Sequence, residues 1–148
     1  MDDVNHMPVL VGLDGHPGAQ IAFDWACREY AGGDTRLVAC CVLTPNLELF
    51  NDVTPTGMSA WRGELQRNLA GPWTDPARAA GIEIATVVVE AETVHDGLLD
   101  AARTHNARMI IVGSNGPGRV TDRLLGSNTY KLAHRSTIPV VIVPPADR

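Results

Sequence analysis

The sequence lacks the features that would place the chain in a membrane or on a nucleic acid. No apolar run reaches the ~18 residues that cross a bilayer. The acidic, polar start from Met1 to His6 has neither the basic n-region nor the apolar h-region of a signal peptide. The chain of 148 residues has a net charge of −5. It carries no stripe of Lys and Arg to follow a phosphodiester backbone. We therefore expect a cytoplasmic protein that binds no membrane and no nucleic acid.

Cysteine is also scarce, and its positions argue against disulfide or metal chemistry. Cys27, Cys40 and Cys41 form no CxxC spacing and cannot all pair. The adjacent Cys40 and Cys41 lie inside an apolar run, which predicts buried thiols in a reducing compartment; a redox switch at this pair is the alternative. None of the five histidines lies three or four residues from another, so no zinc site is expected.

The sequence does contain a regular alternation of short apolar runs and amphipathic segments. Apolar runs predict strands; they are 9–13, 37–43, 82–89, 109–112 and 140–143. The run 37–43 is apolar throughout, as expected for a parallel strand covered on both faces. Apolar residues at helical spacing predict helices between them, over 19–30, 61–80, 94–105 and 125–133, the second interrupted by Pro72 and Pro76. The stretch 44–57, which contains Pro45 and Pro55, predicts a surface loop.

Strands separated by helices imply right-handed crossovers and hence an α/β fold. We predict one domain over residues 1–148, with an ordered core from about residue 7 to 145: an open, doubly wound, five-stranded parallel sheet of Rossmann-like type with helices on both faces. Such sheets bind ligands beyond the carboxyl ends of their strands, where the strand order reverses. That rule directs attention to Asp14, Val42 and Gly113.

The segment from Gly113 to Ser127 carries the chemistry. Gly116 follows Gly113 closely, and nine residues separate it from Gly126. Glycine at these positions is expected to let backbone amides approach a ligand and to adopt positive φ. Gly126 and Ser127 start a predicted helix whose free N–H groups favour an anion, and Arg119 could neutralise a polyphosphate.

A plainer interpretation of the same segment is a turn, with Ser127 as the N-cap of the helix. The sequence has neither GxxxxGK[ST] nor GxGxxG after its first strand. It therefore lacks a lysine placed for the β- and γ-phosphates, which argues against a vigorous P-loop ATPase.

The spacing G-x2-G-x9-G-S resembles that of the nucleotide-binding branch of the universal stress proteins. Gly113, Gly116, Gly126 and Ser127 match it without a gap. The first predicted strand with Asp14 after it, and the stretch 136–144, are similar to the family's opening and closing strands. The resemblance thus covers nearly the whole chain.

The resemblance implies a site for the adenosine part of a nucleotide. Asp14 would accept hydrogen bonds from the ribose hydroxyls; an Asx-turn or helix cap is its alternative role. The backbone at Gly12 and Leu13 would meet the edge of the adenine, with Val42 and Val112 on either side of the ring. Both valines are equally compatible with a place in the core.

The resemblance also implies a phosphate site. Gly113 would pass close to the ribose, and the phosphates would be held by Gly116, Gly126, Ser127 and the Asn128 amide, with Arg119 nearby. The ligand would be ATP, or alternatively AMP or cyclic AMP, with Mg²⁺ held through the phosphates and not by protein side chains. The chain departs from the family at three positions: His16 replaces a common serine, Asn128 a small apolar residue, and Glu92 a glycine.

Three functions remain open at this point. The first is a nucleotide-dependent regulatory protein of the universal stress type that signals by occupancy. The second is a slow ATPase or adenylyl-transferring enzyme, which the missing lysine and missing carboxylate pair disfavour. No catalytic residue is assigned, and enzymatic activity is left open with binding favoured. The third is a dimeric interaction module without a nucleotide; the resemblance itself implies a homodimer through 140–143, which would otherwise be an exposed apolar sheet edge.

Overall fold

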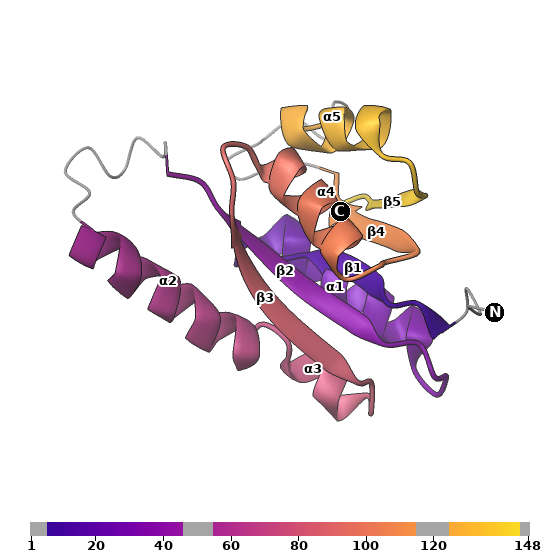
Figure 1. Cartoon of the computed structure of the whole chain (residues 1–148). Coiled ribbons are helices and arrows are strands. Elements are labelled where there is room, and N and C mark those ends of the chain that lie inside the picture. The colour runs from indigo at the N-terminus through magenta and orange to yellow at the C-terminus, as the bar shows by residue number, and fades with distance from the viewer. Residues whose placement is uncertain (1–5, 46–54, 115–124, 146–148) are drawn as a thin grey trace.

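The computed structural model describes residues 6–45, 55–114 and 125–145. Strands and helices alternate along this part of the chain (Figure 1). The strands are β1 Val9–Gly12, β2 Leu37–Leu43, β3 Ile84–Glu90, β4 Met109–Gly113 and β5 Val140–Val143. The helices are α1 Pro17–Tyr30, α2 Pro55–Ala70, α3 Asp75–Ala79, α4 Val94–Thr104 and α5 Ser127–Arg135.

The five strands form one parallel sheet in the order β3-β2-β1-β4-β5. Val9 of the central strand pairs with Leu37 on one side and Met109 on the other. The chain builds outward from β1 through β2 to β3, then crosses to β4 and β5. This confirms the predicted doubly wound parallel sheet and puts the reversal of strand order between β1 and β4.

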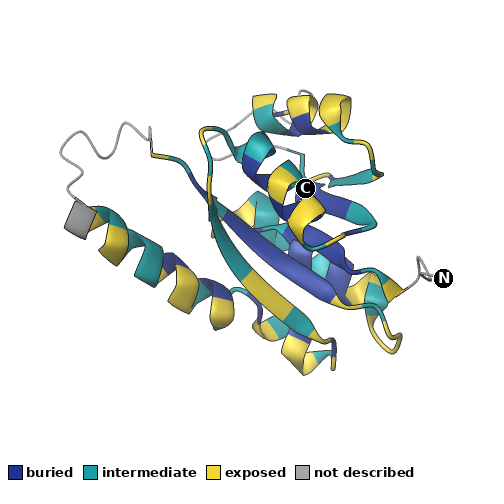
Figure 2. Ribbon diagram, viewed as in Figure 1, coloured by how far each residue is buried: buried dark blue, intermediate teal, exposed yellow. Residues whose placement is uncertain are grey.

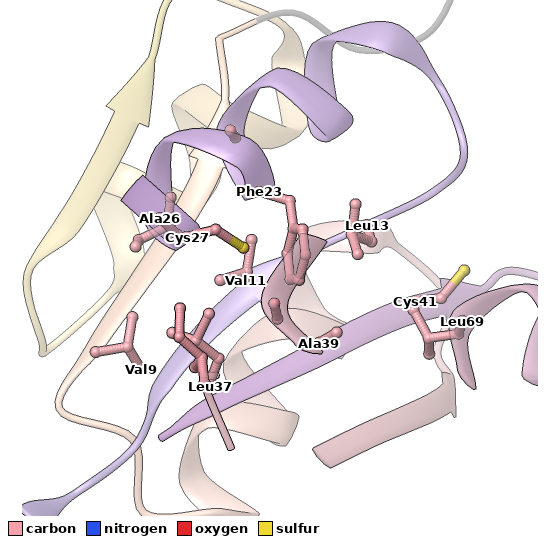
Figure 3. Packing of buried hydrophobic residues seen from close by; sticks show 14 of the residues in the cluster. Val9, Val11, Leu13, Phe23, Ala26, Cys27, Leu37, Ala39, Cys41 and Leu69 are labelled. Atoms are coloured by element: carbon pink, nitrogen blue, oxygen red, sulfur yellow. The ribbon is translucent and has the colours of Figure 1, made fainter. Parts of the chain in front are cut away.

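The helices cover both faces of the sheet, with α1, α2 and α3 on one side and α4 and α5 on the other (Figure 1). Successive side chains of β1 point alternately to the two faces of the sheet, so they belong alternately to two core layers. Val11 packs with Phe23 of α1 in the first layer (Figure 3), whereas Leu10 packs with Leu98 of α4 in the second. The inner strand β2 is buried almost throughout, and the edge strand β3 is partly exposed (Figure 2).

The cysteines are free thiols buried in these layers. Cys41 belongs to the first layer and Cys40 to the second. Burial raises the pKa of each of these two thiols from 9.0 to about 12, with the neighbouring Cys41 adding to the effect at Cys40. The prediction of buried thiols is confirmed, and such thiols are poorly suited to a redox switch, because the reactive species is the thiolate.

Several elements start or end one or two residues from their predicted bounds, and α2 starts six residues earlier than predicted. Helix α2 begins at Pro55, inside the stretch 44–57 that was expected to be a loop. Proline is also favoured in the first turn of a helix, because its missing N–H would have no partner there, and Pro55 occupies that position. Strand β3 runs over Ile84–Glu90, two residues later at its start than expected.

The break between α2 and α3 falls at 71–74, around Pro72 as predicted. Trp25, Trp61 and Trp73 are partly buried and pack against the first core layer, so they act as packing residues. Across residues 6–45, 55–114 and 125–145, no helix is both long and apolar enough for a membrane span.

Candidate functional site

The carboxyl end of β4 and the start of α5 are tied together beside the point where the strand order reverses. The Gly126 N–H donates to the Ser114 carbonyl at 3.0 Å, and the Thr129 hydroxyl donates to the Gly113 carbonyl at 3.1 Å. The Ser114 N–H in turn donates to the Val143 carbonyl of β5 at 3.1 Å. These bonds fix where α5 starts. Gly116 and Arg119 lie outside the described residues.

The first turn of α5 presents unpaired backbone donors. Its first helical hydrogen bond runs from the Tyr130 N–H to the Gly126 carbonyl at 2.9 Å. Within the described part of the chain, the N–H groups of Ser127, Asn128 and Thr129 donate to no acceptor, and no acidic residue lies in this turn. Three free donors at the positive end of a helix form a suitable environment for an anion.

The N-cap of α5 is Gly126, not Ser127. Gly126 has an extended backbone (φ −61°, ψ 154°), and no side chain caps the helix. Ser127 is the first helical residue and is exposed. The interpretation of Ser127 as the cap is therefore wrong, and its hydroxyl is available to a ligand.

The expectation of positive φ is also wrong for the described motif glycines. Among the described glycines, positive φ occurs at Gly15, Gly32 and Gly81. A Cβ built on Gly113 would lie only 2.7 Å from the Gly18 carbonyl oxygen in α1. Glycine is required at position 113 because the end of β4 packs directly against the first turn of α1.

Asp14 lies after β1 and forms an Asx-turn. Its Oδ1 accepts a hydrogen bond of 2.9 Å from the His16 N–H, and the His16 Nδ1 is 3.4 Å from the same oxygen. The carboxylate is 43% exposed, and its Oδ2 accepts no hydrogen bond from any described residue. The structural role of Asp14 is thus confirmed, and one oxygen is left for a ligand.

The loop that carries Asp14 is supported from the side by a tryptophan. Gly15 has φ +85°, and a Cβ there would lie 2.5 Å from Cζ2 of Trp73. The Gln20 amide nitrogen of α1 donates to the Trp73 carbonyl at 3.2 Å. The indole ring therefore packs directly against the backbone next to Asp14.

The residues expected around an adenine lie on the α4 face of the sheet. A Cβ on Gly12 would lie 3.4 Å from Val112 Cγ1, and one on Gly97 would lie 2.6 Å from Val42 Cγ1. Val112 is buried in the second core layer, and the half-buried Val42 packs against that layer. Both valines therefore have a core role, whatever they contact in a complex.

Leu13 offers only its carbonyl to a ligand. Its side chain is buried in the first core layer, and its N–H donates to the Cys40 carbonyl at 2.9 Å. The carbonyl suits an amino group, which donates hydrogen bonds.

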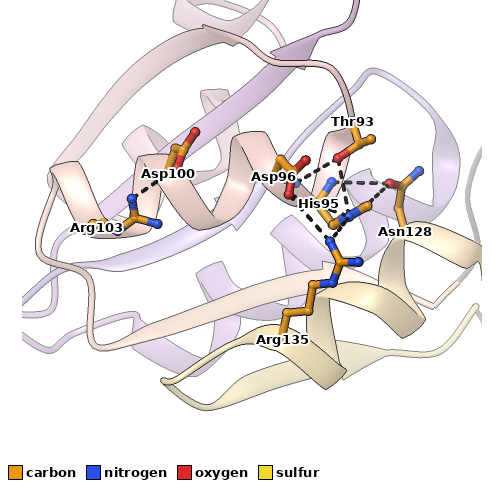
Figure 4. Close-up of polar contacts among 7 residues, drawn as sticks. All are labelled: Thr93, His95, Asp96, Asp100, Arg103, Asn128 and Arg135. Carbon is orange, nitrogen blue, oxygen red and sulfur yellow. Dashed lines mark hydrogen bonds and ion pairs between the residues drawn. The ribbon is translucent and has the colours of Figure 1, made fainter.

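A buried polar contact that sequence reasoning missed joins α4 to α5 (Figure 4). The Asn128 Oδ1 lies 3.2 Å from the His95 backbone N and 2.9 Å from the His95 Nδ1. His95 is only 3% exposed. Thr93 caps α4 by accepting the Asp96 N–H and so puts His95 in the first helical turn, but this local signal does not pair His95 with Asn128. The departure from the family at Asn128 therefore has a partner within the chain.

The described residues at this edge of the sheet offer helix donors at α5, a carboxylate oxygen at Asp14 and a carbonyl at Leu13. Over residues 6–45, 55–114 and 125–145, no three His, Cys, Asp or Glu side chains gather closely enough to hold a metal ion.

Comparison with known proteins gives the same family as the motif. The model of the universal stress protein family matches residues 6–144. A universal stress protein from Mycolicibacterium smegmatis is 32% identical over 148 residues, which cover 95% of this chain and 47% of that protein. The chain spans about half the length of the curated relatives it matches first.

Solved structures are similar over the whole fold. A universal stress protein in complex with cAMP is 27% identical with a TM-score of 0.68, covering 95% of this chain and 98% of that one. A universal stress protein from Archaeoglobus fulgidus in complex with dAMP has a TM-score of 0.67, covering 93% of this chain and 98% of that one. The sequence identity between the two chains is 16%, which supports a shared fold and nothing further. Because the family model spans almost the entire sequence, the chain belongs to the universal stress protein family.

Proposed function

We propose that this chain binds an adenine nucleotide, with ATP as the preferred ligand, and acts as a regulatory protein of the stress response through nucleotide occupancy. One observation carries the proposal: the unpaired N–H groups at the start of α5 lie at the carboxyl edge of the sheet, where α/β sheets bind their ligands. The free Oδ2 of Asp14 follows β1, the strand next to β4.

The proposed roles divide the nucleotide into three parts. The Asp14 Oδ2 accepts from the ribose hydroxyls near Gly113. The Leu13 carbonyl, next to Gly12, accepts from the adenine amino group, with Val42 and Val112 beside the ring. The phosphates are held by Gly126, Ser127 and Asn128, together with Gly116 and Arg119, and Mg²⁺ is held by the phosphates.

Support for an adenine nucleotide comes from the relative that was solved with cAMP and is 27% identical. Cyclic AMP has one phosphate, whereas three unpaired helix donors suit a ligand with more phosphate oxygens. ATP is therefore our first choice, and AMP and cyclic AMP are the alternatives.

Binding without turnover is the proposed mode of action. Phosphoryl transfer needs cations and a nucleophile-orienting group placed around the phosphates. The first turn of α5 has no acidic residue, and Lys131 is exposed in the second turn. We expect at most weak hydrolysis of ATP.

We further propose a cytoplasmic homodimer through β5. Val140, Val141 and Ile142 are only half-buried on this edge strand, and Val141 to Pro144 form a groove with Ile21, Trp25 and Arg28 of α1. A second copy would cover these apolar side chains and the open edge.

A calorimetric titration with ATP, AMP, cyclic AMP and adenosine tests the proposed function directly. We expect ATP to bind most tightly and adenosine most weakly, since adenosine has no phosphate for α5. Phosphate release is measured in parallel and should stay near the uncatalysed rate. No heat and no thermal shift with millimolar ATP and Mg²⁺ would refute nucleotide binding.

A further inference from the structure

A buried histidine connects the two helices on one face of the sheet. His95 lies in the first turn of α4, and Asn128 is the second residue of α5. The two residues are 33 positions apart in the sequence, yet the Asn128 Oδ1 is 3.2 Å from the His95 backbone nitrogen and 2.9 Å from its Nδ1 (Figure 4). His95 is 3% exposed, and a buried polar group is costly to leave without a partner.

The geometry at Nδ1 determines which ring nitrogen carries a proton. The backbone N–H of His95 can only donate, so the Asn128 side chain must turn its oxygen toward α4. The same oxygen faces Nδ1. Since an amide oxygen accepts and does not donate, Nδ1 carries the hydrogen.

The surroundings of Nε2 agree with this assignment. The Arg135 Nη1 lies 3.1 Å from Nε2 and can only donate. The Thr93 Oγ1, at 3.4 Å, already accepts the Asp96 N–H, so its own hydrogen is free to point at Nε2. The Asp96 carboxylate is farther away, at 3.7 Å. The contacts at Nε2 thus agree with an acceptor at that nitrogen and with the hydrogen on Nδ1.

Asn128 combines a side-chain contact with α4 and a free backbone donor in α5. The Asn128 N–H is the middle one of the three unpaired donors in the first turn of α5. Bonds from Gly126 and Thr129 to the end of β4 hold this turn from one side. Two contacts from His95, one at its backbone N–H and one at Nδ1, hold the turn from α4, and Asn128 itself makes both of them.

We propose that His95, acting through Asn128, is a positioning residue that holds the first turn of α5 in the orientation that binds the phosphates of the nucleotide. This inference rests on the proposed function. His95 touches no phosphate; its Nδ1–H and backbone N–H fix the Asn128 side chain, and the peptide of Asn128 follows. Affinity for a phosphate-bearing ligand should therefore depend on His95, whereas affinity for the nucleoside should not.

Two substitutions of His95 test the roles of its two ring nitrogens one at a time. In His95→Asn the amide nitrogen takes the place of Nδ1 and can still donate to Asn128. In His95→Gln the amide group reaches the position of Nε2, and the donor at Nδ1 is lost. Arg103→Gln serves as the matched control, because Arg103 pairs with Asp100 on the exposed side of α4.

Each variant is titrated with ATP and with adenosine. We expect His95→Gln to weaken ATP about tenfold, the loss that follows if the phosphate-binding orientation of the turn falls to about a tenth of its population, and to leave adenosine unchanged. His95→Asn and Arg103→Gln should keep the ATP affinity of the unchanged chain. Equal losses for ATP and adenosine, or no loss for ATP, would overturn the inference while leaving nucleotide binding intact. If the unchanged chain binds no ATP, the proposed function fails and the inference falls with it.

A spectroscopic measurement keeps the test decisive if His95→Gln does not fold. Nitrogen NMR of the unchanged chain should show His95 with its hydrogen on Nδ1. ATP should shift the signals of that Nδ1–H and of the Asn128 backbone amide, and adenosine should not. A hydrogen on Nε2, or ATP binding that leaves both signals in place, would overturn the inference.

Discussion

The Oδ1 of Asp14 accepts a hydrogen bond of 2.9 Å from the His16 N–H. The carboxylate therefore has two roles on two different oxygens: Oδ1 shapes the turn between β1 and α1, and Oδ2 remains available to a ligand. A substitution that keeps one role and removes the other can tell them apart.

We expect Asp14→Asn to weaken ATP binding and to leave stability nearly unchanged. The asparagine Oδ1 can still accept the His16 N–H, but an NH₂ group replaces the acceptor Oδ2. Loss of a hydrogen bond to a charged group corresponds to about 1.5–3 kcal/mol, or roughly ten- to a hundredfold in affinity. Calorimetric titration measures the affinity, and thermal unfolding measures the stability.

Asp14→Ala is the comparison, because it removes the turn and the acceptor together. It should lose the same affinity and in addition some stability, by about 0.5–1.5 kcal/mol. Unchanged ATP affinity in both variants would contradict the assignment of Asp14 to the ribose.

Gly113→Ala should destabilise the fold by about 1–3 kcal/mol, the usual cost of overpacking. Its new Cβ would lie 2.7 Å from the Gly18 carbonyl oxygen, a backbone atom that cannot move alone. Urea unfolding measures the change in the free energy of unfolding. Gly33→Ala is the control, since its Cβ would have its nearest neighbour at 3.6 Å; equal effects of the two substitutions would be evidence against the close approach.

The free energy of unfolding should fall as the pH rises above 9. Burial raises the pKa of the Cys40 and Cys41 thiols from 9.0 to about 12. Between these values the folded state keeps protons that the unfolded state releases. The protonated thiols thus contribute their full stabilisation of the folded state below pH 9, and this stabilisation is lost as the pH approaches 12. Urea unfolding over this range measures how steeply the free energy of unfolding falls with pH. Cys40→Ala should make this dependence shallower, and an unchanged dependence would show that the Cys40 thiol is not its cause.

Ile142→Lys should convert the proposed dimer to a monomer. A lysine on the edge strand β5 sets a charge against the partner and leaves the rest of the sheet in place. Sedimentation at micromolar concentration measures the mass, and thermal unfolding checks the fold. Ala85→Lys adds the same charge to the exposed face of the other edge strand β3, and that variant should stay dimeric. A monomeric unchanged chain would refute the dimer.

The sequence predicted the sheet because parallel strands covered on both faces must be apolar throughout, and the run 37–43 shows this directly. It did not predict the start of α2, because Pro55 is favoured both in loops and in the first turn of a helix. Periodicity carries no information on that choice.

The candidate site was predicted in part. The position of Gly126 at the start of α5 and the turn at Asp14 follow from local rules and are confirmed. The contact between His95 and Asn128 joins residues far apart in the sequence, so no local rule could reveal it. The roles of Gly116 and Arg119, and the domain bounds 1–148, stay predictions.

The indole of Trp73 packs on Gly15, directly beside the carboxylate proposed to hold the ribose. The chain thus carries an intrinsic optical reporter for its own candidate site. In a variant with Trp25→Phe and Trp61→Phe, the remaining emission comes from Trp73 alone, since the sequence has three tryptophans. Any ligand that reshapes the turn at Asp14 should change the colour or intensity of that emission, so occupancy can be followed in real time without attaching a dye.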